Sequence, residues 1–106
     1  MDRNSGGRPD DRLFAIGRAL SCGVRLAVLQ ALTEGDASVG ELVSRTGATQ
    51  PNMSNHLAVL RAAGLVTYRR EGRVVRYQLA SPEADSLVHN LTALANTEPG
   101  FPGRHQ

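Results

Sequence analysis

Residues 49–66 read TQPNMSNHLAVLRAAGLV, and this stretch decides the fold. Met53, Leu57 and Leu60 recur at helical spacing, which predicts a helix with one buried stripe and an N-cap at Thr49. Its first turns are crowded with uncharged hydrogen-bonding side chains, namely Gln50, Asn52, Ser54, Asn55 and His56. Such a concentration of neutral donors and acceptors at a helix N-terminus is typical of a surface that reads a polar partner.

Local signals on both sides of this helix extend the pattern. SVGE at 38–41 is a capping box that predicts a short helix through about Arg45, with Gly47 as its C-terminal stop. After the long helix, apolar and polar residues alternate on both sides of REGR at 70–73, which predicts a β-hairpin. Within that tetrapeptide, Glu-Gly is the predicted two-residue turn.

Three further helices are predicted around this central unit. The first begins near Asp10, the second covers about 23–33 with Ser21 or Cys22 as its cap, and the last covers about 83–96 after Pro82. The predicted fold class is mainly α with a β-hairpin wing, a winged helix-turn-helix of about five helices. Residues 1–9 are expected to be a flexible arm, 10–97 the winged helix-turn-helix domain, and 98–106 an irregular tail.

Composition narrows the functional classes. At 106 residues, 41% hydrophobic and 21% charged, the chain suits one globular domain with a modest core. The single cysteine, Cys22, excludes an internal disulfide, and we expect it to be a small capping or buried residue, with a redox or metal role as the alternative. No apolar run is long enough to span a membrane and the N-terminus is unlike a signal peptide, so we expect a cytoplasmic protein.

The positive charge is concentrated in one segment. Residues 61–76 contain five arginines and one acid, whereas the other residues contain seven arginines and nine acids. A basic hairpin beside a neutral, polar helix is the arrangement of a winged helix-turn-helix, in which the helix reads base edges and the wing contacts phosphates. The predicted contacts to double-stranded DNA are Thr49, Gln50, Asn52, Ser54, Asn55, His56, Arg69, Arg70, Arg73 and Arg76. Arg61 is expected to be an ordinary surface charge.

Three blocks, LSCGVRLAVLQAL, SVGELVSRTGATQPNMSNHLAVLRAAGLV and YRREGRVVRYQL, resemble the ArsR/SmtB-type (arsenic-repressor) transcriptional regulators of bacteria. The resemblance runs from about Phe14 to Leu79, and one departure is Gly23, where the family commonly has a proline. It implies a homodimer through the first and last helices that represses a promoter and releases it on a signal. The dimer contacts expected on this basis are Leu13, Leu87, Leu91 and Leu94.

The family's familiar metal sites are absent from this sequence. Residues 38–45 contain no cysteine pair, and the positions matching the site of the last helix hold Ser81, Glu83, Leu94 and Thr97. Asp85 and His89, spaced i, i+4, remain the best candidates for a nickel or zinc effector, although a surface ion pair explains the same spacing.

Other classes of function fit less well. The sequence has no phosphate-binding glycine loop and no catalytic triad pattern, so an enzyme is not expected. RNA binding is disfavoured because Tyr68 and Tyr77, the only candidates for base stacking, are expected to be buried in strands. The preferred interpretation is a homodimeric repressor that binds a pseudo-palindromic operator. The alternatives are a metal-responsive repressor with a non-standard site, or a sensorless winged helix that acts with a co-regulator protein.

Overall fold

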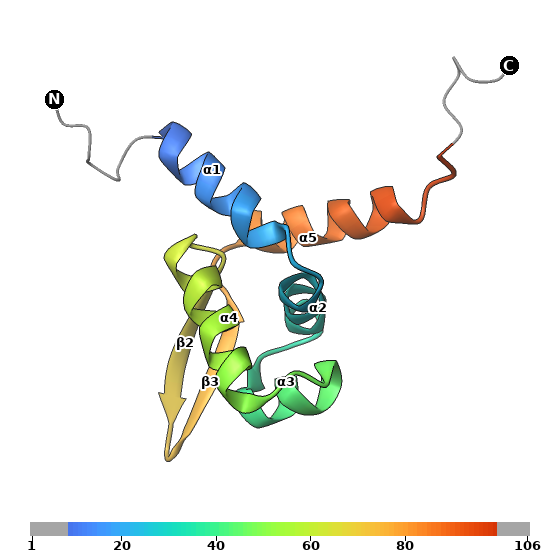
Figure 1. Cartoon of the computed structure of the whole chain (residues 1–106). Helices are drawn as coiled ribbons and strands as arrows, with labels where there is room; N and C mark the ends of the chain where they lie inside the picture. Colours follow the sequence, from blue (N-terminus) through green and yellow to red (C-terminus); the bar gives the residue numbers. More distant parts are fainter. Residues whose placement is uncertain (1–8, 100–106) are drawn as a thin grey trace, which may run out of the picture.

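The computed structural model describes residues 9–99, which form five helices and three short strands in the order α1, α2, β1, α3, α4, β2, β3, α5. Their bounds are α1 Pro9–Leu20, α2 Gly23–Leu32, β1 Ala37–Ser38, α3 Val39–Thr46, α4 Gln50–Ala62, β2 Val66–Glu71, β3 Val74–Leu79 and α5 Pro82–Ala95. Figure 1 shows α1 and α5 toward one end of the molecule, and α3, the start of α4 and the tip of the β2–β3 hairpin toward the other. The predicted arm and tail lie outside the described residues, except that Pro9 already belongs to α1 and that 98–99 follow α5.

The predicted caps of the two central helices are confirmed. The Ser38 hydroxyl accepts a hydrogen bond from the Glu41 backbone N–H, and the Glu41 carboxylate accepts one from the Ser38 N–H. Gly47 ends α3 with a φ of 81°, a left-handed conformation that favours glycine. Thr49 caps α4 by accepting from the Asn52 N–H. These local interactions fix where each helix of the helix-turn-helix begins.

The start of α2 differs from the prediction in one respect. Cys22 occupies the N-cap position, but its side chain makes no capping hydrogen bond. The Ser21 hydroxyl donates instead to the Arg18 carbonyl at the end of α1. Ser21 therefore hydrogen-bonds the C-terminal end of α1 and does not cap the N-terminus of α2.

The hairpin forms as predicted, but the sheet has a third strand and the turn lies one residue later. The strand order is β1-β3-β2, all antiparallel, and the sequence pattern did not predict the two-residue strand β1. Glu71 pairs with Val74, so the turn residues are Gly72 and Arg73, not Glu-Gly. Gly72 has a φ of 65°, and a tight hairpin turn commonly needs a positive φ at its first central position, where glycine is unstrained.

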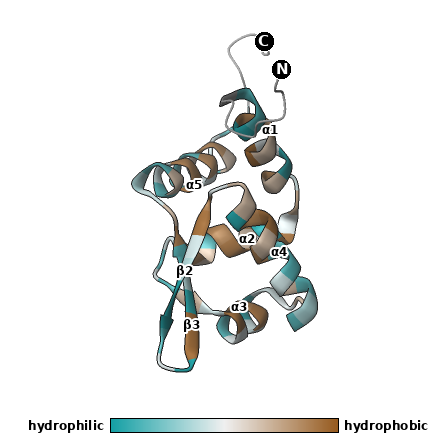
Figure 2. Cartoon of the chain, turned by 90° about the vertical axis from the view of Figure 1, so that its left-hand side faces the viewer, coloured by the Kyte–Doolittle hydropathy of each residue, from teal (hydrophilic) through white to brown (hydrophobic). Residues whose placement is uncertain are grey.

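The core lies where α2, α3 and α4 meet. Its largest fully buried side chains are Leu29, Leu42, Met53, Leu57, Leu60 and Val28. The predicted stripe of α4 is thus buried, and Figure 2 shows the apolar central helix α2 surrounded by the other elements. This packing orients α4 so that its opposite, polar side faces solvent.

Among residues 9–99, no single helix is long and apolar enough to cross a membrane. Helices α1 and α2 reach that length and hydropathy only together, and they are bent by 98° relative to each other.

Candidate nucleic-acid interface

The exposed side of α4 carries the polar residues singled out in the sequence. Gln50, Asn52, Ser54 and Asn55 are all exposed, and their side chains make no hydrogen bond with another described residue. Their donors and acceptors are therefore available to a partner. Because Met53 and Leu57 are completely buried on the other side, the helix cannot rotate about its axis without exposing its core residues.

His56, on the next turn of α4, has a different environment. It is half-buried, and its Nδ1 lies 3.3 Å from Nη1 of Arg25 on α2. The same guanidinium donates to the carbonyls of Ala19 and Arg18 at the end of α1. One arginine thus joins three helices next to the polar surface of α4.

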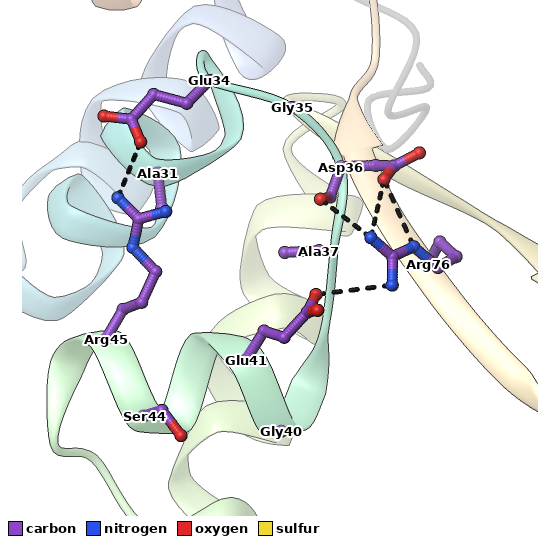
Figure 3. Close-up of a pocket in the computed structure, with 10 residues that line it drawn as sticks. All are labelled: Ala31, Glu34, Gly35, Asp36, Ala37, Gly40, Glu41, Ser44, Arg45 and Arg76. Carbon is purple, nitrogen blue, oxygen red and sulfur yellow. Dashed lines mark hydrogen bonds and ion pairs between the residues drawn. The ribbon is translucent and has the colours of Figure 1, made fainter.

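Two of the four wing arginines are held by acids. Arg69 and Arg76 are cross-strand neighbours, and both contact the Asp36 carboxylate, at 2.7 Å and 2.9 Å respectively. Arg76 also lies 3.4 Å from Glu41, so it spans from the turn before β1 to the capping box of α3 (Figure 3). These contacts connect the wing to the helix-turn-helix.

The electrostatics of this cluster favour the ionised forms. The pKa of Asp36 is lowered, first by its hydrogen bond with Arg76 and next by that with Arg69. The pKa of Glu41 is lowered chiefly by the Ser38 backbone N–H, and further by the charge of Arg76. In turn, Asp36 raises the pKa of both arginines. The ion pairs are thus intact at neutral pH.

Arg70 and Arg73 differ from the other two arginines of the wing. Both are exposed, and neither forms an ion pair with any residue between 9 and 99. Arg73 stands in the turn at the tip of the hairpin. Local acids therefore leave these two guanidiniums, of the four on the wing, available to an external anion.

The prediction that both tyrosines are buried in strands is wrong for Tyr68, whose exposed fraction is 44%. Tyr68 and Tyr77 are cross-strand neighbours with ring centroids 5.6 Å apart. Of the two, only Tyr77 packs against the core, because the hairpin extends beyond the core where Tyr68 lies. Arg61 of α4 is exposed, as expected, and its guanidinium also covers the Tyr68 ring at 4.6 Å. This cation–π contact joins the C-terminal half of α4 to the wing.

The candidate dimer residues occupy the opposite end of the molecule. Leu13 is 61% exposed and Leu94 is 69% exposed, whereas Leu91 is half-buried and Leu87 packs against the core. The structure adds Phe14, which is 61% exposed beside Leu13. The sequence pattern missed Phe14 because a residue adjacent to the apolar stripe is not distinguishable from an edge of the core.

The metal candidates form the predicted pair and nothing more. His89 Nε2 lies 3.5 Å from Asp85 Oδ1, and the side chain of His89 is exposed whereas that of Asp85 is half-buried. Within the described part of the chain, no three His, Cys, Asp or Glu residues come together as a metal site.

Comparison with known proteins identifies the family. Residues 22–68 match the model described as "Bacterial regulatory protein, arsR family". The HTH-type transcriptional regulator KmtR of Mycobacterium tuberculosis is 36% identical over 104 residues, covering 92% of this chain and 78% of KmtR. This chain belongs to the arsR family.

Solved structures of similar proteins agree with the fold of this arsR-family regulator. A homodimeric winged helix-turn-helix DNA-binding domain, Mb0332 of Mycobacterium bovis, superimposes with a TM-score of 0.80 at 28% identity, covering 96% of this chain and all of that one. The transcriptional repressor BigR of Xylella fastidiosa gives a TM-score of 0.74 at 34% identity, covering 92% of this chain and all of BigR. The predicted winged helix-turn-helix and the predicted role as a DNA-binding transcriptional regulator are confirmed.

Proposed function

We propose that this arsR-family regulator is a homodimeric repressor that inserts the start of α4 into the major groove of a pseudo-palindromic operator. The observation that carries the proposal is the placement of two surfaces. The start of α4 and the wing tip lie toward one end of the molecule, and the exposed apolar residues of α1 and α5 belong to the elements at the other (Figure 1).

At the DNA end, the division of labour follows from side-chain chemistry. Asn and Gln amides can bond adenine bidentately, which suits Gln50, Asn52 and Asn55 to base edges. Arg70 and Arg73, which have no acid partner among residues 9–99, are suited to phosphates, which attract guanidiniums regardless of sequence. Arg69 and Arg76, also predicted as DNA contacts, are bound to Asp36, and we therefore assign them to holding the wing in place.

At the other end, the proposed occupant is a second copy of the chain. Leu13 and Phe14 on α1 and Leu94 on α5 are too exposed to contribute much to the core of one copy. A two-fold dimer through these helices would bury them and present two recognition helices to two half-sites. The homodimeric state of Mb0332 supports a dimer of this chain.

Two kinds of signal could release the repressor from DNA, a metal ion or a co-regulator protein. Metal-responsive control rests on the Asp85–His89 pair, but two ligands on one helix leave the coordination of nickel or zinc incomplete, so a second copy would have to supply the rest. Control by a co-regulator protein is the remaining alternative, and it needs no ligand set within the chain.

A binding selection tests the main proposal. The wild-type protein is used to enrich duplexes from a random library, and fluorescence anisotropy then compares the enriched duplex with a shuffled one. Asn52→Ala is expected to lose affinity mainly for the enriched duplex, while the matched control Asn96→Ala, an exposed site at the C-cap of α5 on the side away from Leu94, behaves as wild type. Failure to enrich any duplex, or a monomer by light scattering, would contradict the proposal.

A further inference from the structure

The contact between Arg25 and His56 carries an inference about how the recognition helix is prepared for DNA. Arg25 Nε donates to the Ala19 carbonyl at 2.8 Å, and its Nη2 donates to the Arg18 carbonyl at 3.2 Å. Both carbonyls belong to the last turn of α1. The guanidinium is thereby anchored, because carbonyls at a helix C-terminus attract cations and accept their hydrogen bonds.

This anchor dictates the protonation pattern of the imidazole. A guanidinium has only N–H donors, so a hydrogen bond between Arg25 Nη1 and His56 Nδ1 requires that Nδ1 be the acceptor. In a neutral imidazole the single ring proton then resides on Nε2. His56 is therefore held as the Nε2–H tautomer.

The Nε2–H group of His56 faces water. It has no hydrogen-bond partner within the described part of the chain, and no buried side-chain nitrogen or oxygen there lacks a partner, so Nε2 must be accessible. His56 follows Asn52 by four residues, so the two share one side of α4. The outward donor accordingly belongs to the same surface as the proposed base-reading residues.

We propose that Arg25 is a positioning residue that fixes the His56 tautomer, and that Nε2–H of His56 donates a hydrogen bond to a phosphate of the DNA backbone. This rests on the proposed function, in which α4 lies in the major groove. His56 offers one fixed donor, because its other ring nitrogen is already hydrogen-bonded to Arg25. One donor suits a phosphate oxygen, which only accepts, whereas a base edge is read better by an amide that both donates and accepts. Arg25 itself does not touch DNA.

The tautomer is tested without DNA, by long-range proton–nitrogen NMR of ¹⁵N-labelled protein at pH 8, where imidazoles are neutral. The His56 signals are assigned by their loss in His56→Gln. Wild type is expected to show the Nε2–H form, and Arg25→Ala is expected to show a mixture of both tautomers. Arg25→Met, which keeps an unbranched side chain but has no hydrogen-bond donor, serves the same purpose if Arg25→Ala does not fold. An Nδ1–H form in wild type, or no change on removing the guanidinium, overturns the positioning role.

The phosphate contact is tested by two isosteric replacements on the duplex enriched by wild type. The amide nitrogen of Gln lies near the position of Nε2, whereas that of Asn lies near the position of Nδ1. His56→Gln should retain affinity, while His56→Asn should lose about tenfold per half-site, because hydrogen bonds to charged groups contribute about that much. The loss should be equal on enriched and shuffled duplexes.

Different results would overturn the phosphate contact, the proposed function and the positioning role of Arg25. Equal affinities of the Gln and Asn variants overturn the phosphate contact while the wild type still binds its duplex. If wild type enriches no duplex, the proposed function falls together with the phosphate contact, and the NMR result still decides whether Arg25 sets the tautomer.

Discussion

The division of the wing arginines into paired and unpaired residues leads to a quantitative prediction for Arg73→Ala. Each phosphate contact by a cation contributes about 0.9 to the slope of log affinity against log salt concentration. Arg73 has no acid partner among the described residues, so a dimer that loses two such contacts should lose about 1.8 from the slope. Over the fourfold range from about 50 to 200 mM salt, the affinity of wild type should therefore fall about twelve times more than that of the variant.

Arg69→Ala is the matched control for this experiment. Arg69 is bound to Asp36 at 2.7 Å, so its charge is already compensated within the protein. Fluorescence anisotropy over a salt series should give this variant a slope close to that of wild type. A wild-type slope for Arg73→Ala, or equal losses of slope for both variants, would refute the phosphate contact of Arg73.

Four further predictions follow from the described contacts. Asn55→Ala should cost roughly 1–3 kcal/mol on the enriched duplex and much less on shuffled DNA, as measured by anisotropy. Leu94→Asp should give a folded monomer by circular dichroism and light scattering, since the residue is 69% exposed in one copy. If nickel or zinc binds, His89→Ala should abolish the tightest event in isothermal titration without changing metal-free DNA affinity, and an unaltered isotherm would exclude the site. The lowered pKa of Asp36 means that its stabilisation is complete above about pH 3.9 and is lost as the pH falls through the folded-state value. Urea unfolding should therefore show a larger acid-side loss of stability in wild type than in Asp36→Asn, which keeps only the contribution of Glu41.

Sequence alone predicted the elements whose signals are local. The capping box at Ser38, the cap at Thr49 and the buried stripe of α4 depend on residues within a few positions of each other, and all three are present. Strand β1 was missed because two residues are too short to show a period, and their pairing with β3 joins positions about forty residues apart. Alternation placed Tyr68 and Tyr77 on one face correctly, but it does not reveal how far the core extends along that face.

The candidate site shows the same limit. Charge counting located the basic wing, yet it could not separate Arg70 from Arg76, because the acid that holds Arg76 is Asp36, forty residues earlier in the chain. Likewise, the interaction of Arg25 with His56 spans thirty-one positions and has no local signature. Residue types can be read from a sequence, whereas pairing between distant side chains requires the fold.

The double role of Ser38 has a consequence for how the protein opens locally. Its backbone stands opposite Arg76 in the sheet, while its side chain and N–H form the capping box that starts α3. The base of the wing and the first turn of α3 should therefore exchange their amide hydrogens together, as one cooperative unit. The segment beyond the Arg70–Val75 pair lies outside that unit and should exchange earlier. The tip can thus adapt to the shape of a duplex while the helix-turn-helix stays closed.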